Sequence, residues 1–119
     1  NQLMHTGSKI PLVKPNSSMP DTLIEMTSKG FGVAIIIEND IVKGVITDGD
    51  LRRHMDHLMS MTAQEIGNNE PIIIEEDNLA VKALSIMNDK KINVIIVTNK
   101  KNSPVGILHI HDCLRAGLT

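Results

Sequence analysis

The hydrophobic pattern is clearest between residues 33 and 59, where it predicts two strands and a helix. Val33–Ile37 is apolar at every position, which is typical of a strand covered on both faces. Residues 41–46 are again rich in β-branched residues. Polar residues follow from Thr47, and apolar or weakly polar ones then recur at helical spacing, at Leu51, His54, Met55 and Leu58. We therefore predict a strand that runs directly into a helix ending near Met59.

The residues before this stretch predict a short extended segment and a helix. The segment is Ile10–Val13, where proline restricts the backbone. Ser17 or Ser18 is the expected N-cap, and Gly30 is the expected end of the helix. We expect its inward-facing stripe to consist of Leu23, Met26 and Thr27.

The same order of elements returns in the second half. An extended segment is expected at Pro71–Ile74, and strands are expected at Asn93–Thr98 and Val105–Leu108. The last strand runs into a helix that ends at Gly117. The helix between these segments has an expected core stripe of Leu79, Ala83, Leu84 and Met87.

The two halves align residue by residue. At one constant offset Leu23 matches Leu84, Met26 matches Met87 and Val33 matches Val94. After a one-residue insertion the matching pairs are Gly44 with Gly106, Thr47 with His109, Asp50 with Asp112 and Arg53 with Arg115. A half of this size buries too little surface to be stable alone, so two copies should pack together. We predict an α/β fold of two β-α-β-β-α repeats, residues 1–60 and 61–119, about a pseudo-twofold axis with two related clefts.

The junction at Thr47 has the chemistry of a ligand site. A helix start offers free N–H groups and a positive dipole end to an anion, and the Thr47 hydroxyl can donate to a phosphate oxygen. The carboxylate of Asp50 could hold a vicinal diol such as ribose. Thr47-x-x-Asp50 also fits a helix-capping box, which needs no ligand. Repetition of the pattern at His109 and Asp112 favours the ligand reading.

Composition narrows the classes of partner. A net charge of −2 over 119 residues argues against nucleic-acid binding, and no apolar run approaches a membrane span. One Phe and no Trp or Tyr leave no aromatic cage for a base. A single cysteine, Cys113, fits a reducing cytoplasmic setting. Because the chain begins at Asn1 rather than Met, we expect it to be part of a longer polypeptide.

The repeated unit resembles the CBS domain pair, or Bateman module. Gly44-Val45-Ile46-Thr47-Asp48-Gly49-Asp50 fits that family's Gly-h-h-Thr-x-x-Asp pattern, and residues 106–112 fit it except for His109. The chain is also similar to the C-terminal part of arabinose 5-phosphate isomerases of the Kdo pathway. The motifs that carry this likeness are Met4-His5-Thr6-Gly7, Thr47-Asp48-Gly49-Asp50-Leu51-Arg52-Arg53, His109-Ile110-His111-Asp112 and Leu114-Arg115-Ala116-Gly117.

The resemblance implies a regulatory module that carries no isomerase active site and needs no cofactor. Its implied ligand is a nucleotide or nucleotide-sugar, either CMP-Kdo or AMP/ATP. Its implied partners are a preceding sugar isomerase (SIS) domain and further copies of the chain. The expected ligand-binding residues are Ile10, Pro11, Thr47, Asp48, Asp50, Arg53, Pro71, His109, His111 and Asp112. Histidine in place of Thr leaves open whether the second cleft takes phosphate, a carboxylate-bearing or sugar ligand, or nothing.

Other readings remain open at this point. The pair could be a structural module with vestigial clefts that joins subunits. Asp48 and Asp50 could bind Mg²⁺ in an enzyme, but the chain offers no complete phosphate clamp and nucleophile. His109 and His111 could share an anion or a metal, although a third metal ligand at credible spacing is missing. We therefore predict no metal site.

Overall fold

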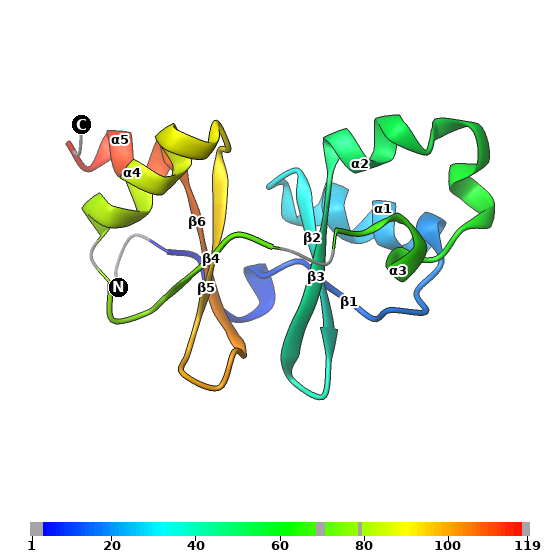
Figure 1. Ribbon diagram of the computed structural model, residues 1–119, viewed down its shortest axis with the longest axis horizontal. Coiled ribbons are helices and arrows are strands. Elements are labelled where there is room, and N and C mark those ends of the chain that lie inside the picture. Colours follow the sequence, from blue (N-terminus) through cyan, green and yellow to red (C-terminus); the bar gives the residue numbers. More distant parts are fainter. Residues whose placement is uncertain (1–3, 69–70, 79, 118–119) are drawn as a thin grey trace. The chain divides into compact units, whose positions relative to one another are not determined.

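The computed structural model describes residues 4–68, 71–78 and 80–117, and the chain forms two compact units (Figure 1). One unit is Pro11–Pro71, and the other combines Asn1–Ile10 with Ile72–Thr119. Residues 4–10 therefore pack with the second half of the chain. No described helix has the length and apolar character needed to cross a membrane.

The unit Pro11–Pro71 is a three-stranded sheet with helices on one face (Figure 1). Strand β1 (Leu12–Val13) is parallel to β2 (Val33–Glu38), which pairs antiparallel with β3 (Ile41–Thr47). Its helices are α1 (Met19–Lys29), α2 (Asp48–Arg53) and α3 (Ala63–Ile66), with the 3₁₀ helix η2 (Met55–Ser60) between the last two.

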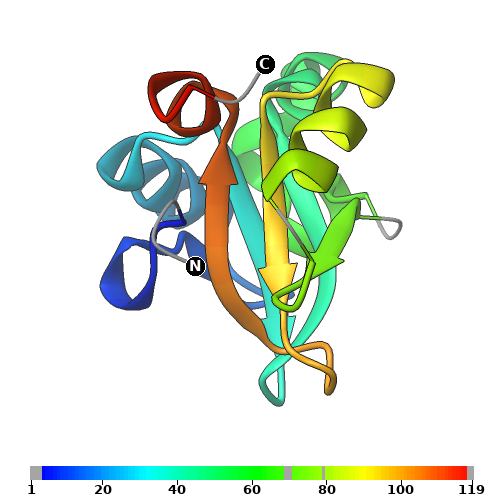
Figure 2. The same ribbon diagram turned by 90° about the vertical axis from the view of Figure 1, so that its left-hand side faces the viewer.

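The second unit repeats this arrangement (Figure 2). Strand β4 (Ile73–Glu75) is parallel to β5 (Val94–Thr98), which pairs antiparallel with β6 (Pro104–His109). Helices α4 (Ala80–Lys90) and α5 (Ile110–Arg115) pack on it, and the 3₁₀ helix η1 (Gly7–Lys9) precedes β1 in the chain. The predicted α/β class is confirmed, with a three-stranded sheet in each unit.

The two cores use matching positions. Met26, Ala34 and Ile46 are buried in one core, and their counterparts Met87, Ile95 and Leu108 are buried in the other. Cys113 is fully buried where the first unit has Leu51 packed against its core, as the repeat predicts. Leu79, predicted to belong to the second core, lies outside the described residues.

Helix α1 begins and ends where local chemistry requires. The Ser18 hydroxyl accepts a hydrogen bond from the Asp21 amide at 3.2 Å, and Gly30 adopts a left-handed φ of 77°. Both predictions are confirmed. Thr27, expected on the inward face, is exposed, whereas Thr22 is fully buried. Thr22 tolerates burial because its hydroxyl donates to the Ser18 carbonyl at 2.8 Å.

The prediction of one helix from Thr47 to about Met59 is wrong. Helix α2 ends at Arg53, His54 leaves helical geometry with φ −114° and ψ 19°, and the chain continues as η2. This break buries Leu58 in the core while Met55 and Met59 remain 62% exposed. The apolar spacing alone could not distinguish these three side chains.

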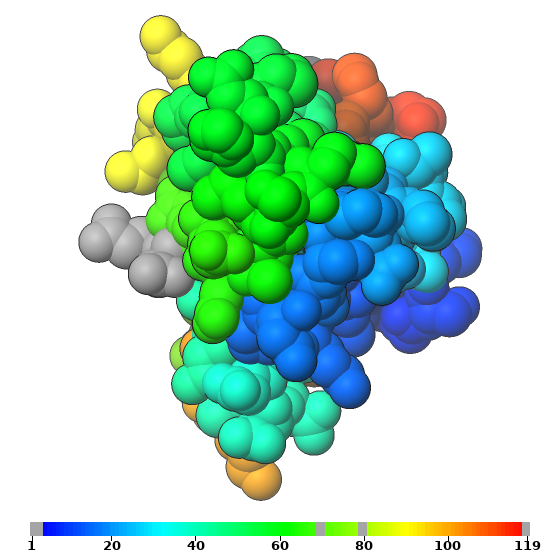
Figure 3. Space-filling view, turned by 90° about the vertical axis from the view of Figure 1, so that its right-hand side faces the viewer, coloured from blue at the N-terminus to red at the C-terminus, as the bar shows by residue number. Residues whose placement is uncertain are grey.

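Backbone hydrogen bonds also join distant segments in the first unit. The Ala63 amide donates to the Ser17 carbonyl at 2.8 Å, and the Met19 amide donates to the Met61 carbonyl at 3.1 Å. Figure 3 shows these blue and green stretches side by side. They fix the start of α1 against the start of α3.

In each unit the last strand also pairs with a short segment outside the sheet, which we call the crossing segment: the residues around Asn68 in one unit and those around His5 in the other. Asn68 and Val45 exchange two backbone hydrogen bonds, of 2.8 and 3.0 Å. His5 and Ile107 do the same at 2.8 and 2.9 Å, which places the N-terminal segment beside β6 (Figure 2). A glycine makes room at each crossing. A Cβ on Gly44 would lie 2.5 Å from the Asn68 carbonyl oxygen, and one on Gly106 would lie 2.4 Å from the Met4 sulfur.

We expect Gly44→Ala to be more damaging than Gly106→Ala. The first substitution meets backbone, and we expect a loss of about 2 kcal/mol in the free energy of unfolding, as for other overpacked sites. The second meets mainly a flexible thioether that can move, so its loss should be smaller. Urea unfolding of both variants checks this. Met4→Ala should relieve Gly106→Ala further, and equal losses at the two glycines would contradict the account.

Candidate functional site

The first junction, Thr47–Arg53, is a capping box closed by a buried carboxylate. The Asp50 amide donates to Thr47 Oγ1 at 3.4 Å. In return Asp50 Oδ2 accepts from the Thr47 amide at 2.9 Å and from the Thr47 hydroxyl at 3.1 Å. The hydroxyl thus accepts and donates at once, and a ligand phosphate would have to share it.

Asp50 is only 4% exposed, and the guanidinium of Arg53 pairs with its other oxygen, Oδ1. Arg53 itself is largely exposed, as is Asp48 one residue into the helix. The capping reading of the sequence is therefore realised. A carboxylate with partners on both oxygens can still accept from a ligand hydroxyl, because each oxygen has two lone pairs.

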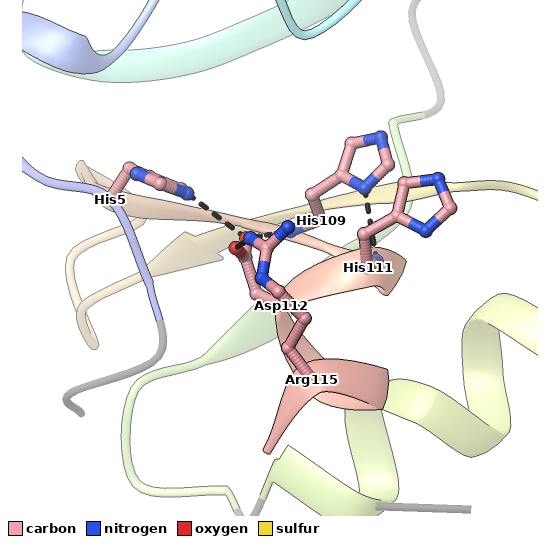
Figure 4. Close-up of polar contacts among 5 residues, drawn as sticks. All are labelled: His5, His109, His111, Asp112 and Arg115. Atoms are coloured by element: carbon pink, nitrogen blue, oxygen red, sulfur yellow. Dashed lines mark hydrogen bonds and ion pairs between the residues drawn. The ribbon is translucent and has the colours of Figure 1, made fainter. Parts of the chain in front are cut away.

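The second junction, His109–Arg115, has the same frame with a different cap. Asp112 Oδ2 accepts from the His109 amide at 3.2 Å, and Arg115 pairs with Oδ1. The ring of His109 accepts at Nδ1 from the His111 amide at 3.1 Å. The two imidazoles stack with centroids 4.7 Å apart (Figure 4). Because Nδ1 accepts, neutral His109 carries its proton on Nε2.

A third partner of Asp112 comes from the other end of the chain. Nε2 of His5 lies 3.0 Å from Asp112 Oδ2, across 107 positions of sequence (Figure 4). An ionised carboxylate can only accept, so His5 Nε2 carries the hydrogen and donates. In Figure 4 His5 and Arg115 reach the carboxylate from separate segments of the chain.

These contacts shift the ionisation of both partners in the junction. Burial raises the pKa of Asp112, but hydrogen bonds from the His109 amide and His5 and the charges of His5 and Arg115 outweigh it, and the net pKa is lowered. Burial, followed by the neighbouring His111, lowers the pKa of His109, against the opposing effect of Asp112. At neutral pH the site therefore holds an ionised Asp112 and a neutral His109.

A cavity of about 520 Å³ opens beside Asp112. Its polar lining is rich in hydrogen-bond donors, and the full lining is Met4, His5, Thr6, Lys9, Asp112, Arg115 and Ala116. Two of these side chains, Lys9 and Arg115, are permanent cations at neutral pH. The cavity thus presents one buried carboxylate among positive and neutral donors, which suits a ligand with both hydroxyl and anionic groups.

The lining of this cavity does not include the other predicted site residues. Ile10 and Pro11 are buried, and the Pro11 carbonyl accepts from the Ile35 amide at 2.8 Å. Pro71 is half-buried and His111 is exposed. None of these four, and not His109, lines the cavity beside Asp112.

Metal ligands do not gather in the part of the chain that the structure describes. No three His, Cys, Asp or Glu side chains there are placed to hold an ion. Burial, and then the charge of Asp112, raise the pKa of the Cys113 thiol. A buried protonated thiol is a poor metal ligand and a poor nucleophile.

Sequence reasoning missed His5, Thr6 and Lys9 as parts of the site. They lie in the segment before the first predicted strand, and local spacing gives no sign that this segment crosses β6. One signal was available in the sequence. His109 lacks the hydroxyl that a Thr at that position would donate to Asp112, which indicates that another residue supplies this hydrogen bond.

As the pH is lowered, we expect the free energy of unfolding to decrease more steeply in the wild type than in His109→Asn. The folded-state pKa of His109 lies below the ordinary 6.5. Its stabilising contribution is therefore complete above pH 6.5 and is lost as the pH falls below that value, because the unfolded chain takes up the proton first. Asparagine caps a helix without titrating. Urea midpoints at about pH 7.5 and 5.5 measure this, and parallel losses in the two proteins would contradict it.

Comparison with known proteins places this geometry in a family. Arabinose 5-phosphate isomerase KdsD of Pseudomonas aeruginosa is 37% identical over 120 residues, covering 98% of this chain and 37% of the relative. KdsD of Escherichia coli K12 is 37% identical over 122 residues, covering 99% of this chain and also 37% of the relative. The chain thus spans just over a third of the length of these relatives.

Solved structures share the fold at low sequence identity. The crystal structure of CBSX2 in complex with AMP superposes with a TM-score of 0.85 at 20% identity, covering 98% of this chain and 93% of that one. The cytosolic domain of the Mg²⁺ channel MgtE in complex with ATP gives 0.79 at 17% identity, covering 93% and 46%. The sequence profile of the CBS domain matches residues 2–57 and again 63–119. The chain belongs to the CBS domain family and is a tandem CBS pair.

Proposed function

We propose that this CBS pair is a ligand-sensing regulatory module for a nucleotide or nucleotide-sugar and performs no isomerase chemistry itself. The observation that carries the proposal is the cavity beside Asp112, where a buried carboxylate lies among cationic and neutral donors. A carboxylate recognises hydroxyl groups, whereas Lys9 and Arg115 recognise negative charge. A phosphorylated or acidic sugar derivative presents both.

The rest of the lining fits such a molecule. Met4 and Ala116 offer apolar surface against which a base or sugar ring can pack, and Thr6 adds a hydroxyl. Because the sequence has one Phe and no Trp or Tyr, the base would pack on aliphatic and thioether groups and on the His5 imidazole. A volume of about 520 Å³ lies in the range of small-molecule sites.

We propose a further ligand-contact region at the junction Thr47–Arg53. There Thr47 would meet phosphate and Asp50 the ribose hydroxyls, with Asp48 and Arg53 exposed nearby to add charge. Pro11 and Pro71 would add backbone and apolar contacts in this unit. In the other unit, Ile10 would add apolar contacts, and His109 and His111 would contact the sugar or acid part of a ligand bound there. The roles of Thr47 and Asp50 are carried over from the family pattern position by position.

The relatives narrow the ligand and the context. The structures named above hold AMP and ATP, which makes adenine nucleotides the first candidates. The similarity to KdsD adds CMP-Kdo, a nucleotide-sugar formed later in the Kdo pathway, as a feedback ligand. In that setting the parent protein would convert ribulose 5-phosphate to arabinose 5-phosphate in a SIS domain. Ligand binding regulates such a domain only if it favours one conformation over another.

A structural role is the second candidate. Both junction aspartates already have partners within their own unit, as structural caps do. Exposed apolar side chains also lie on the helices of each unit, at Ile24, Met55, Met59, Val81 and Leu114. These surfaces would join copies of the chain, through contacts between CBS pairs, whether or not a ligand binds.

A thermal-shift screen with AMP, ATP, CMP and CMP-Kdo tests the sensing function. A ligand at about 100 times its Kd should stabilise the fold by roughly 2.7 kcal/mol, which is readily seen as a higher Tm. No shift with any of the four at millimolar concentration would remove the sensor proposal.

For a ligand found in this screen, we expect Asp112→Asn to raise the Kd at least tenfold, because the substitution removes a hydrogen bond to a charged group. Asp50→Asn tests the first junction in the same way. Asp89→Asn is the matched control, because it makes the same change at an exposed carboxylate on α4 of the same unit. A control that weakens binding as much as Asp112→Asn would show that the effect is not local.

Sedimentation tests the structural role. We expect a concentration-dependent dimer in the wild type and a monomer when Met55 and Met59, both 62% exposed, are replaced by lysine. Unchanged self-association in this double variant would exclude the η2 surface.

A further inference from the structure

The two junction aspartates have equivalent sets of donors from different sources. Asp50 Oδ2 accepts from the amide and the hydroxyl of Thr47, at 2.9 and 3.1 Å. Asp112 Oδ2 accepts from the His109 amide at 3.2 Å and from His5 Nε2 at 3.0 Å. On the other oxygen Arg53 and Arg115 occupy matching places. The imidazole of His5 thus stands where the first junction has the Thr47 hydroxyl.

The chemistry of histidine explains the difference. The Thr47 oxygen accepts from the Asp50 amide and donates its own hydrogen to the carboxylate. An imidazole nitrogen either accepts or donates, and Nδ1 of His109 accepts from the His111 amide. The His109 ring therefore performs the capping half of the threonine role, which leaves the donor half to another residue.

We propose that His5 is a positioning residue that replaces the missing threonine hydroxyl, so that the second junction is complete only while the N-terminal segment is paired with β6. The first junction is self-contained, because Thr47, Asp50 and Arg53 lie within seven consecutive residues. The second depends on a contact across 107 positions. The consequence for ligand binding rests on the proposed function, whereas the dependence of the Asp112 contacts on the N-terminal segment does not.

The geometry gives this dependence a route. The His5 backbone is held against β6 by two hydrogen bonds to Ile107, and the Met4 side chain lies next to Gly106. Met4, His5, Thr6 and Lys9 also line the cavity that Asp112 enters. Movement of this segment would change the donor to the carboxylate and the cavity wall together.

A double-mutant cycle tests the replacement. The proteins are the wild type, His5→Ala, His109→Thr and the double variant, and the readout is hydrogen exchange of the Ile107 amide, which donates to the His5 carbonyl at 2.9 Å. We expect His5→Ala to speed this exchange about tenfold, the factor of one hydrogen bond to a charged group. In the His109→Thr background the local hydroxyl is restored, and His5→Ala should then change the rate less than about twofold.

The first unit supplies the internal control. The Val45 amide makes the matching bond to the Asn68 carbonyl, and its exchange should be the same in all four proteins. His5→Gln keeps a side-chain N–H and should keep the slow exchange of Ile107. Equal effects of His5→Ala in both backgrounds, no effect in the wild type, or an equal rise at Val45 would each overturn the proposal.

The effect of His5 on ligand binding is tested by isothermal titration calorimetry of the whole chain with AMP. If AMP binds the wild type, His5→Ala should weaken its Kd several-fold, and His109→Thr should restore it in the double variant. Tighter binding by His5→Ala would mean that His5 competes with the ligand, and it would overturn a positioning role. Failure of AMP and the other nucleotides to bind the wild type would count against the proposed function, while the exchange cycle would still decide the role of His5.

Discussion

The structure depends on a buried carboxylate at the third position of a very short helix. Helices α2 and α5 have six residues each, too few to be stable in isolation. In each, the aspartate closes a capping box onto the last residue of the preceding strand and pairs with an arginine one turn later. The carboxylate thereby joins strand, helix start and helix end at one point. The same atoms are the ones that the proposed ligand would use, so stability and recognition share one group.

Crossing segments add a second constraint. In each unit a segment outside the sheet forms a β-bridge to the last strand of that unit. Next to each bridge the strand has a glycine, where a Cβ atom would clash with the bridging segment. In the first unit the crossing peptide is Asn68, which lies close in sequence to the strand it meets. In the second it is His5, from the opposite end of the chain. The repeats are alike in fold, but the second one depends on a distant segment.

This difference bears on how the module could report ligand binding. The cavity beside Asp112 is lined on one side by the N-terminal segment and on the other by α5. A change in the contacts of Asp112 therefore also affects the N-terminal segment, which lines the same cavity. The first junction contains no such link among its described contacts. The two junctions therefore differ in whether a distant segment of the chain contacts the aspartate.

The sequence by itself determined the repeat, the fold class and the helix caps at Ser18 and Thr47. Periodicity fixed the strands, because apolar runs are read locally, and the Thr47-to-Asp50 spacing specified a capping box through contacts of neighbouring residues. Spacing failed for the helix beyond Arg53, since the same apolar positions fit either a continuous helix or a break that buries Leu58 alone. Only the tertiary structure decided that His5 donates to Asp112 and that Lys9 and Thr6 line its cavity. Hydrogen bonds between residues far apart in the chain leave no local periodic signal, and they form only when the crossing segment meets the strand.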